Sequence, residues 1–209
     1  MKIVVTGNIG SGKRALLRGL GSRITNSLLV EERFGLDSEL ASFFKTQKKC
    51  EKNAFPNSEA LNLQLTFLKA RFDNEVTSIR AEHRCVIQQR SLFEDRLIFA
   101  EAQRKLGTLS QRDFEHYLSL FEERASVARA PTLLFYLRAK PAALRESIRR
   151  RGLNHEAILS DRFLETLNEQ YEELESGLKR FCPKVRFVPI DVEGKSQEEI
   201  LNLAVSQVE

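Results

Sequence analysis

The sequence predicts a three-layer α/β fold in which a central parallel sheet of about five strands is flanked by helices. Short apolar runs rich in β-branched residues alternate along the chain with longer segments whose apolar residues recur every three or four positions. A glycine-rich turn directly follows the first apolar run. The 209 residues are 42% hydrophobic and 30% charged, which is enough for one sizeable core. Strands that alternate with helices in this way form a parallel sheet covered on both faces.

The first half of the chain begins with an apolar run at residues 2–6, which fits a buried parallel strand. A helix follows the glycine-rich turn and is expected to close near Gly19 and Gly21. Residues 59–81 carry an apolar stripe with helical spacing, which predicts a long helix. The other elements expected here are a strand at 28–30, a helix and then a loop within 37–57, broken at Pro56, and a strand at 85–88.

In the second half, residues 132–137 give the clearest strand signal. Pro141 opens the next helix, at a position where proline is well tolerated, and that helix ends at Gly152. The sequence contains no repeat, low-complexity tract or linker, so residues 1–209 are predicted to form a single domain. The remaining elements expected are helices at 92–105, 111–128, 161–179 and 197–208 and a strand at 185–190.

Charge and composition exclude several classes of protein. The net charge of +4 comes from 33 basic and 29 acidic residues, a balance that does not suit nucleic-acid binding. The three cysteines are scattered without metal-ligand spacing, so free thiols are expected. No signal peptide precedes the first strand, and no apolar run approaches the ~20 residues that span a bilayer. The sequence therefore predicts a cytoplasmic protein with no membrane partner.

A phosphate-binding loop is the strongest motif in the sequence. Gly7-Asn8-Ile9-Gly10-Ser11-Gly12-Lys13 matches GxxxxGK directly after a strand and before a helix, as in a P-loop fold. Glycines let the backbone amides point at phosphate oxygens, and Lys13 adds a full positive charge. The alternative is a plain strand-to-helix turn. The predicted phosphate-binding residues of this loop are Gly7, Gly10, Ser11, Gly12, Lys13 and the adjoining Arg14.

Arg14 departs from the usual pattern of such loops. The residue after the lysine is normally Ser or Thr, whose hydroxyl binds Mg²⁺. A guanidinium has no acceptor atom and cannot ligate a metal. Arg14 is therefore expected to repel Mg²⁺ or to replace its charge, so that the loop holds phosphate without holding the ion.

Four further stretches resemble the deoxynucleoside kinase family, in an order that matches across nearly the whole chain. They are Val30-Glu31-Glu32, the pair Gln64 and Arg71, Gln89-Arg90-Ser91 through Asp95, and Arg149-Arg150-Arg151-Gly152 followed by Glu156. The resemblance implies a nucleoside site, a nucleotide such as ATP as phosphate donor, and a homodimer. It also implies an arginine-rich lid segment, residues 147–158, that covers the phosphates.

The resemblance assigns roles to these residues. Glu31, oriented by Arg90, looks like the base that takes the proton from the nucleoside 5′-hydroxyl. Arg151 resembles the phosphate-binding arginine of the lid segment, and Glu156 resembles the carboxylate that meets the sugar 3′-hydroxyl. The residues expected to read the nucleobase are Gln64, Arg71 and Asp95.

The residues themselves support these roles and leave alternatives open. Gln64 and Arg71 are two helical turns apart and face the same way, although they could equally belong to a solvated helix face. Phe67 and Phe93 could stack on the base. A carboxylate held by a guanidinium can deprotonate a hydroxyl, but Glu31 and Arg90 could also form a structural ion pair.

Other departures fall on the metal and phosphate side. The family's carboxylate before Arg-Ser is Gln89 here, a poor Mg²⁺ ligand, and no metal-ligating residue is predicted. Two lid positions that carry arginine in the family are Ser147 and Leu153. These losses should slow phosphoryl transfer, which depends on positioning and charge stabilisation.

The sequence is compatible with three functions. The departures favour a pseudokinase that binds a deoxynucleoside or nucleotide, transfers phosphate weakly or not at all, and signals to a protein partner. The intact nucleoside positions also suit an active ATP-dependent deoxynucleoside kinase of nucleotide salvage with an unusual donor site. A third function is phosphoryl transfer to another small hydroxylated substrate, because fold does not fix function.

Overall fold

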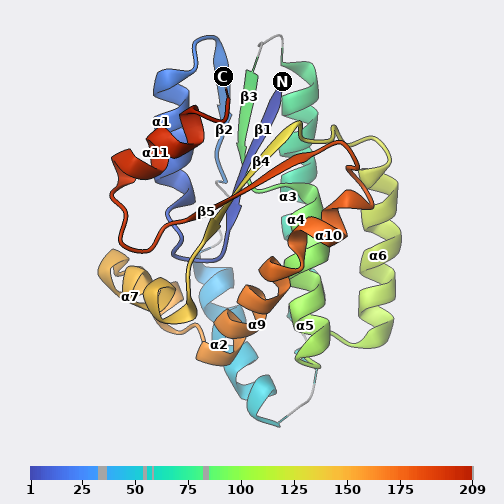
Figure 1. The fold of residues 1–209 in the computed structure, drawn as a ribbon. Helices are drawn as coiled ribbons and strands as arrows, with labels where there is room; N and C mark the ends of the chain where they lie inside the picture. The colour runs from blue at the N-terminus through green and yellow to red at the C-terminus, as the bar shows by residue number, and fades with distance from the viewer. Residues whose placement is uncertain (33–36, 54–55, 58, 82–84, 209) are drawn as a thin grey trace.

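The structure is a computed structural model that describes residues 1–32, 37–53, 56–57, 59–81 and 85–208. Within these residues, five parallel strands form one sheet in the order β2-β3-β1-β4-β5 (Figure 1). The predicted parallel α/β sheet is thus confirmed. The strands are β1 (Lys2–Gly7), β2 (Ser27–Val30), β3 (Cys85–Gln89), β4 (Leu133–Arg138) and β5 (Arg186–Asp191).

Helices cover both faces of the sheet, as Figure 1 shows, with α1 and α11 on one side and α3 to α6, α9 and α10 on the other. In the described residues none of them has the length and apolar character needed to cross a membrane. The helices are α1 (Lys13–Arg23), α2 (Asp37–Asn53), α3 (Ala60–Arg80), α4 (Leu92–Glu94), the π-helix η1 (Asp95–Ala100), α5 (Glu101–Lys105), α6 (Gln111–Ala125), α7 (Pro141–Arg151), α8 (Asn154–Ala157), α9 (Asp161–Glu172), α10 (Leu174–Lys179) and α11 (Gln197–Val205).

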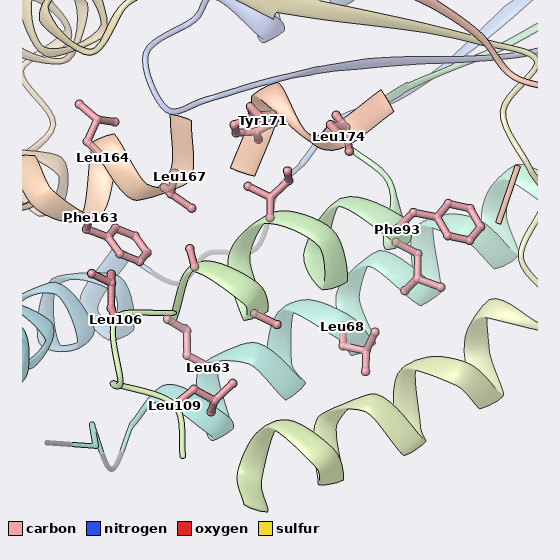
Figure 2. Close-up of a cluster of buried hydrophobic side chains, with 14 of the residues drawn as sticks. Leu63, Leu68, Phe93, Leu106, Leu109, Phe163, Leu164, Leu167, Tyr171 and Leu174 are labelled. Carbon is pink, nitrogen blue, oxygen red and sulfur yellow. The ribbon is translucent and has the colours of Figure 1, made fainter. Parts of the chain in front are cut away.

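Each face of the sheet has its own apolar core, because side chains alternate between the faces along a strand. In β1, Ile3 and Val5 join the core under α1 and α11, whereas Val4 joins the larger core on the other face. Figure 2 shows part of this larger core, in which residues of α3, α4 and α9 meet. Both faces of β1 are therefore buried, which explains its continuous apolar run.

The first helix does not close near Gly19 and Gly21, as the sequence predicted, but continues to Arg23. The glycines serve close packing instead. A Cβ at Gly21 would lie 2.7 Å from the δ carbons of Leu29, and one at Gly19 would lie 3.0 Å from those of Leu201. The absence of side chains at these positions lets β2 and α11 approach the helix backbone.

Two of the predicted long helices are interrupted. The helix expected at 92–105 contains the π-helical turn η1, a feature often found at functional sites. The helix expected at 161–179 is divided at Glu173 into α9 and α10, and the short helix α8 was not predicted. A Cβ at Gly177 of α10 would lie 2.9 Å from Leu97 of η1, so these two irregular segments pack closely.

Candidate functional site

A cavity of about 560 Å³ lies at the carboxyl ends of strands β1, β2 and β3. Residues of α2, α3, α5 and the lid segment also line it. Ligands in parallel α/β sheets bind at this edge. Most of the predicted site residues line the cavity, namely Gly10, Gly12, Lys13, Arg14, Gln64, Arg71, Arg90, Arg151 and Glu156. Gly7, Ser11, Glu31 and Asp95 are not among its lining residues.

The phosphate loop has the backbone that anion binding requires. Gly10 and Gly12 both have a φ of 88°, in the left-handed region that favours glycine. Helix α1 starts at Lys13 without a side-chain cap, so its first amides are open to an anion. Lys13 Nζ donates to the carbonyl of Asn8 at 2.8 Å. Burial, reinforced by the charge of Arg90, holds the pKa of Lys13 well below its ordinary value.

The loop is tied to the second half of the chain through Asn8. Asn8 Nδ2 donates to the carbonyl of Leu164 at 3.0 Å and to Oδ1 of Asn168 at 3.3 Å, both in α9. The Asn8 Oδ1 atom accepts from the amide of Ile9 at 2.8 Å. The conformation of the loop therefore depends on the helix that follows the lid segment.

Glu31 does not form the predicted pair with Arg90. Both Nε and Nη2 of Arg18 donate to the Glu31 carboxylate, at 2.9 and 3.1 Å, and Arg14 Nε lies 3.8 Å from it. Arg90 Nη1 instead donates to Oε2 of Glu32 at 2.7 Å. Consecutive residues of an extended chain point in opposite directions, so only one carboxylate of the pair can enter the cavity. That residue is Glu32.

Glu32 is held by two cations and an amide. Besides the bond from Arg90, it accepts from Arg71 Nη2 at 2.6 Å and from Gln89 Nε2 at 3.0 Å. Burial raises the pKa of this carboxyl, but the charges of Arg90, Arg71 and Lys13 outweigh burial and lower the pKa to about 2. Glu32 is therefore ionised at neutral pH and faces the cavity next to the phosphate loop.

Arg90 is fixed on several sides. Its Nε donates to Glu94 Oε1 at 3.0 Å, and its guanidinium carbon lies 4.9 Å from the centre of the Phe99 ring. The Arg90 backbone has a φ of 60°, an unusual conformation for a residue other than glycine and one that is found at functional sites. Arg90 is thus positioned to orient Glu32.

The residues expected to read the base lie close together, as their spacing predicted. Arg71 Nη1 donates to Asp95 Oδ1, and Gln64 on the same helix lines the cavity. Gln64 is 2% exposed, and its Oε1 has no hydrogen-bond partner among the described residues. A buried amide without a partner costs free energy unless a ligand completes it. The arrangement therefore offers a hydrogen-bonding group to a base edge.

The phenylalanines that line the cavity differ in part from those expected. Phe67 lines the cavity as predicted, but Phe93 packs outside it against the rings of Phe121 and Phe181. Phe99, from the π-helix η1, takes the second position in the cavity. Sequence spacing missed Phe99 because nothing in the apolar pattern of residues 92–105 marks a π-helical turn.

Two residues of the lid segment form an ion pair with each other. Arg151 Nη2 lies 2.6 and 2.5 Å from the two carboxylate oxygens of Glu156. Arg149 and Arg150 are exposed, and each lies within 4 Å of Glu146. Of these three arginines only Arg151 lines the cavity, so its neighbours do not replace the missing lid arginines in this conformation.

The residues present do not fit a protein-held Mg²⁺. Within the described part of the chain, no three His, Cys, Asp or Glu side chains are grouped so that they could hold a metal ion. Arg14 stands at one ligand position of such loops, and its side chain is 58% exposed beside Glu31. At the second position where a Mg²⁺ ligand is expected, Gln89 offers only one neutral oxygen. This atom, Oε1, is buried and has no partner among the described residues.

Comparison with known proteins is consistent with this geometry. Residues 3–208 match the family model for deoxynucleoside kinase. The chain is 29% identical over 184 residues to a deoxyadenosine kinase of Dictyostelium discoideum. The aligned residues cover 88% of this chain and 70% of that relative. It is 28% identical over 208 residues to a deoxyadenosine/deoxycytidine kinase of Bacillus subtilis (strain 168). The aligned residues cover 99% of this chain and 90% of that relative.

Solved structures show the same fold. A deoxyadenosine kinase from M. mycoides with bound dATP superposes with a TM-score of 0.81 at 22% identity, covering 100% of this chain and 98% of that one. The same enzyme with products dCMP and a flexible dCDP gives a TM-score of 0.82 at 21% identity, with the same coverage.

Proposed function

Because the chain belongs to the deoxynucleoside kinase family, we propose that it binds a deoxynucleoside in the cavity and transfers phosphate to it weakly or not at all. The observation that carries this proposal is the contrast between the two ends of the cavity. The nucleoside end contains the ionised Glu32 carboxylate and the Gln64 amide, whose Oε1 has no partner in the described part of the chain. The phosphate end has Arg14 and Gln89 where Mg²⁺ ligands would stand.

In this proposal Glu32, rather than Glu31, accepts the proton of the 5′-hydroxyl. A general base must lie within hydrogen-bonding reach of the hydroxyl and must be unprotonated. Glu32 lines the cavity together with Lys13, so a hydroxyl beside it would face the phosphate loop. Arg90 would hold the carboxylate in place, and Lys13 would stabilise negative charge on the donor phosphates.

We propose a base that carries an exocyclic amino group, with deoxyadenosine as the first candidate. Oε1 of Gln64 can accept a hydrogen bond from such a group. Asp95 holds Arg71, and Arg71 and Phe67 line the same part of the cavity. Two relatives are named for deoxyadenosine or for both deoxyadenosine and deoxycytidine, which bear amino groups on their bases.

The lid segment would close over the donor phosphates through Arg151. Glu156 would release Arg151 and bind the sugar 3′-hydroxyl instead. The donor would be ATP or another nucleotide, since the loop geometry suits any polyphosphate. If transfer is lost, the bound state would be passed to a protein partner, and pairing of two copies would follow the family resemblance.

A specific observation also favours the alternative, an active kinase. Glu32 is already ionised and oriented, as phosphoryl transfer to a hydroxyl requires. The test is to incubate the protein with radiolabelled ATP and each of the four deoxynucleosides, with and without Mg²⁺, and to measure binding of the same compounds by calorimetry. Binding without turnover supports the proposal, turnover at ordinary kinase rates supports the alternative, and no binding at millimolar concentration contradicts both.

A further inference from the structure

Besides Gln64 and Gln89, a third buried amide lines the cavity. Gln103 of α5 lines the cavity together with Gln64 of α3. Gln103 is 1% exposed, and its Oε1 has no hydrogen-bond partner among the described residues. An amide that is buried in this way is stabilised when a ligand supplies the missing hydrogen bond.

The placement of Gln103 follows from the helices on this side. Asp95, Phe99 and Gln103 are four residues apart along η1 and α5, and the last two line the cavity. In Figure 2, Leu63, which precedes Gln64, lies at the same end of the apolar cluster as Leu106 and Leu109, which closely follow Gln103. Gln64 and Gln103 thus reach the same cavity from α3 and α5.

The turn after Gln103 does not use its side chain. The backbone carbonyl of Gln103 accepts from the amides of Thr108 and Leu109, at 3.0 and 3.1 Å, and from the Thr108 hydroxyl at 3.2 Å. These bonds would persist if the amide were replaced by an apolar group. The side chain is therefore free to serve a ligand without being required for the local backbone structure.

We infer that Gln103 is a specificity residue that reads the outer edge of a purine, and this inference rests on the proposed nucleoside function. Adenine has a second edge, formed by N7 and the amino group, and a glutamine amide can bind both. Because the amide nitrogen and oxygen have nearly the same shape, Gln103 can turn to donate to N7 and accept from the amino group. Gln64 would bind the other hydrogen of that amino group. A pyrimidine has no N7 and would leave Gln103 without a partner.

The experiment combines one change in the protein with one change in the ligand. Calorimetry measures the affinity of the unmodified protein and of Gln103→Leu for deoxyadenosine, for 7-deaza-2′-deoxyadenosine, in which a C–H replaces N7, and for deoxycytidine. The unmodified protein should bind the deaza compound roughly 5- to 100-fold more weakly than deoxyadenosine, as expected when a buried polar group loses its partner. Gln103→Leu should bind these two purines equally and should keep its affinity for deoxycytidine within about twofold.

Gln170→Leu is the matched control. Gln170 of α9 is also a buried glutamine, 2% exposed, with an Nε2 that has no partner among the described residues, but it does not line the cavity. This variant should retain the discrimination between the two purines. Equal binding of both purines by the unmodified protein, or equal losses for all three compounds in Gln103→Leu, would overturn the assignment. Failure of deoxyadenosine itself to bind the unmodified protein would instead contradict the proposed function.

Discussion

Arg151 and Glu156 form an ion pair, with Nη2 of the arginine 2.6 and 2.5 Å from the two carboxylate oxygens. One residue is assigned to phosphate and the other to the sugar, so each must release its partner before it can bind its ligand. In the proposed function, the ion pair would therefore couple the two halves of the cavity. A nucleoside bound to Glu156 would make Arg151 available to a nucleotide.

This coupling can be tested with Glu156→Gln. The amide cannot hold Arg151 as an ion pair, so ATP should bind the variant more tightly than the unmodified protein in the absence of nucleoside. Because the Arg151 side chain is 44% exposed, the gain should not exceed about 1 kcal/mol, or roughly fivefold. Calorimetry with ATP measures it, and Glu146→Gln, which removes the partner of Arg149 and Arg150, is the control. An unchanged ATP affinity in Glu156→Gln would argue against the coupling.

A pair of matched variants distinguishes the catalytic roles of the adjacent residues Glu31 and Glu32. Glu32→Gln should lower any phosphoryl transfer by about 10²- to 10⁴-fold, the usual contribution of a general base. Glu31→Gln loses the ion pairs with Arg18 and Arg14, whose side chains are more than half exposed, and should stay within about threefold of the unmodified rate. Transfer of label from ATP to deoxyadenosine is the measurement. A larger loss in Glu31→Gln than in Glu32→Gln would restore the assignment made from the sequence.

Nucleotide binding should not require Mg²⁺. At ~4 Å and an effective dielectric near 20, two unit positive charges repel by about 4 kcal/mol, so an ion close to Arg14 would be disfavoured. EDTA should leave the affinity for ATP unchanged or raise it, as measured by calorimetry. Arg14→Ser combined with Gln89→Glu should create a dependence on Mg²⁺. A strong loss of ATP affinity on chelation in the unmodified protein would show that the ion is held in another way.

The ion pairs of Glu32 predict how stability depends on pH. Its pKa is lowered from 4.5 to about 2 in the folded protein, so its ionised form stabilises the fold above pH 4.5 and this contribution disappears as the pH falls towards 2. Urea unfolding should show that Glu32→Gln is less stable than the unmodified protein at pH 6. The difference should shrink steadily below pH 4.5, because a protonated glutamate resembles glutamine. A difference that stays constant with pH would contradict this account.

The fold was predictable from the sequence because its signals are local and agree with one another. Alternating strand and helix patterns lead directly to the five-stranded parallel sheet, and the GxxxxGK loop marks the edge where the cavity lies. The spacing of Gln64 and Arg71 was sufficient to place both on one side of α3, facing the cavity. These inferences required only helical and strand geometry.

The errors arose where tertiary packing decides the outcome. Gly19 and Gly21 resembled a helix end, but their role is to admit Leu201 and Leu29 against the helix. After β2 two glutamates are adjacent, and the one that faces the cavity is the one held by Arg71 and Arg90, which are distant in the sequence. Phe99 and Gln103 could not be assigned because residue spacing does not reveal a π-helical turn.

The bonds from Asn8 to Leu164 and Asn168 join residues separated by 156 and 160 positions in the chain. Contacts of such long range form late in folding, because the intervening chain must first be brought together. During synthesis, the loop emerges long before α9 and lacks the partners that set its conformation. A nascent chain truncated before Leu164 would therefore contain the whole GxxxxGK sequence and yet retain no nucleotide.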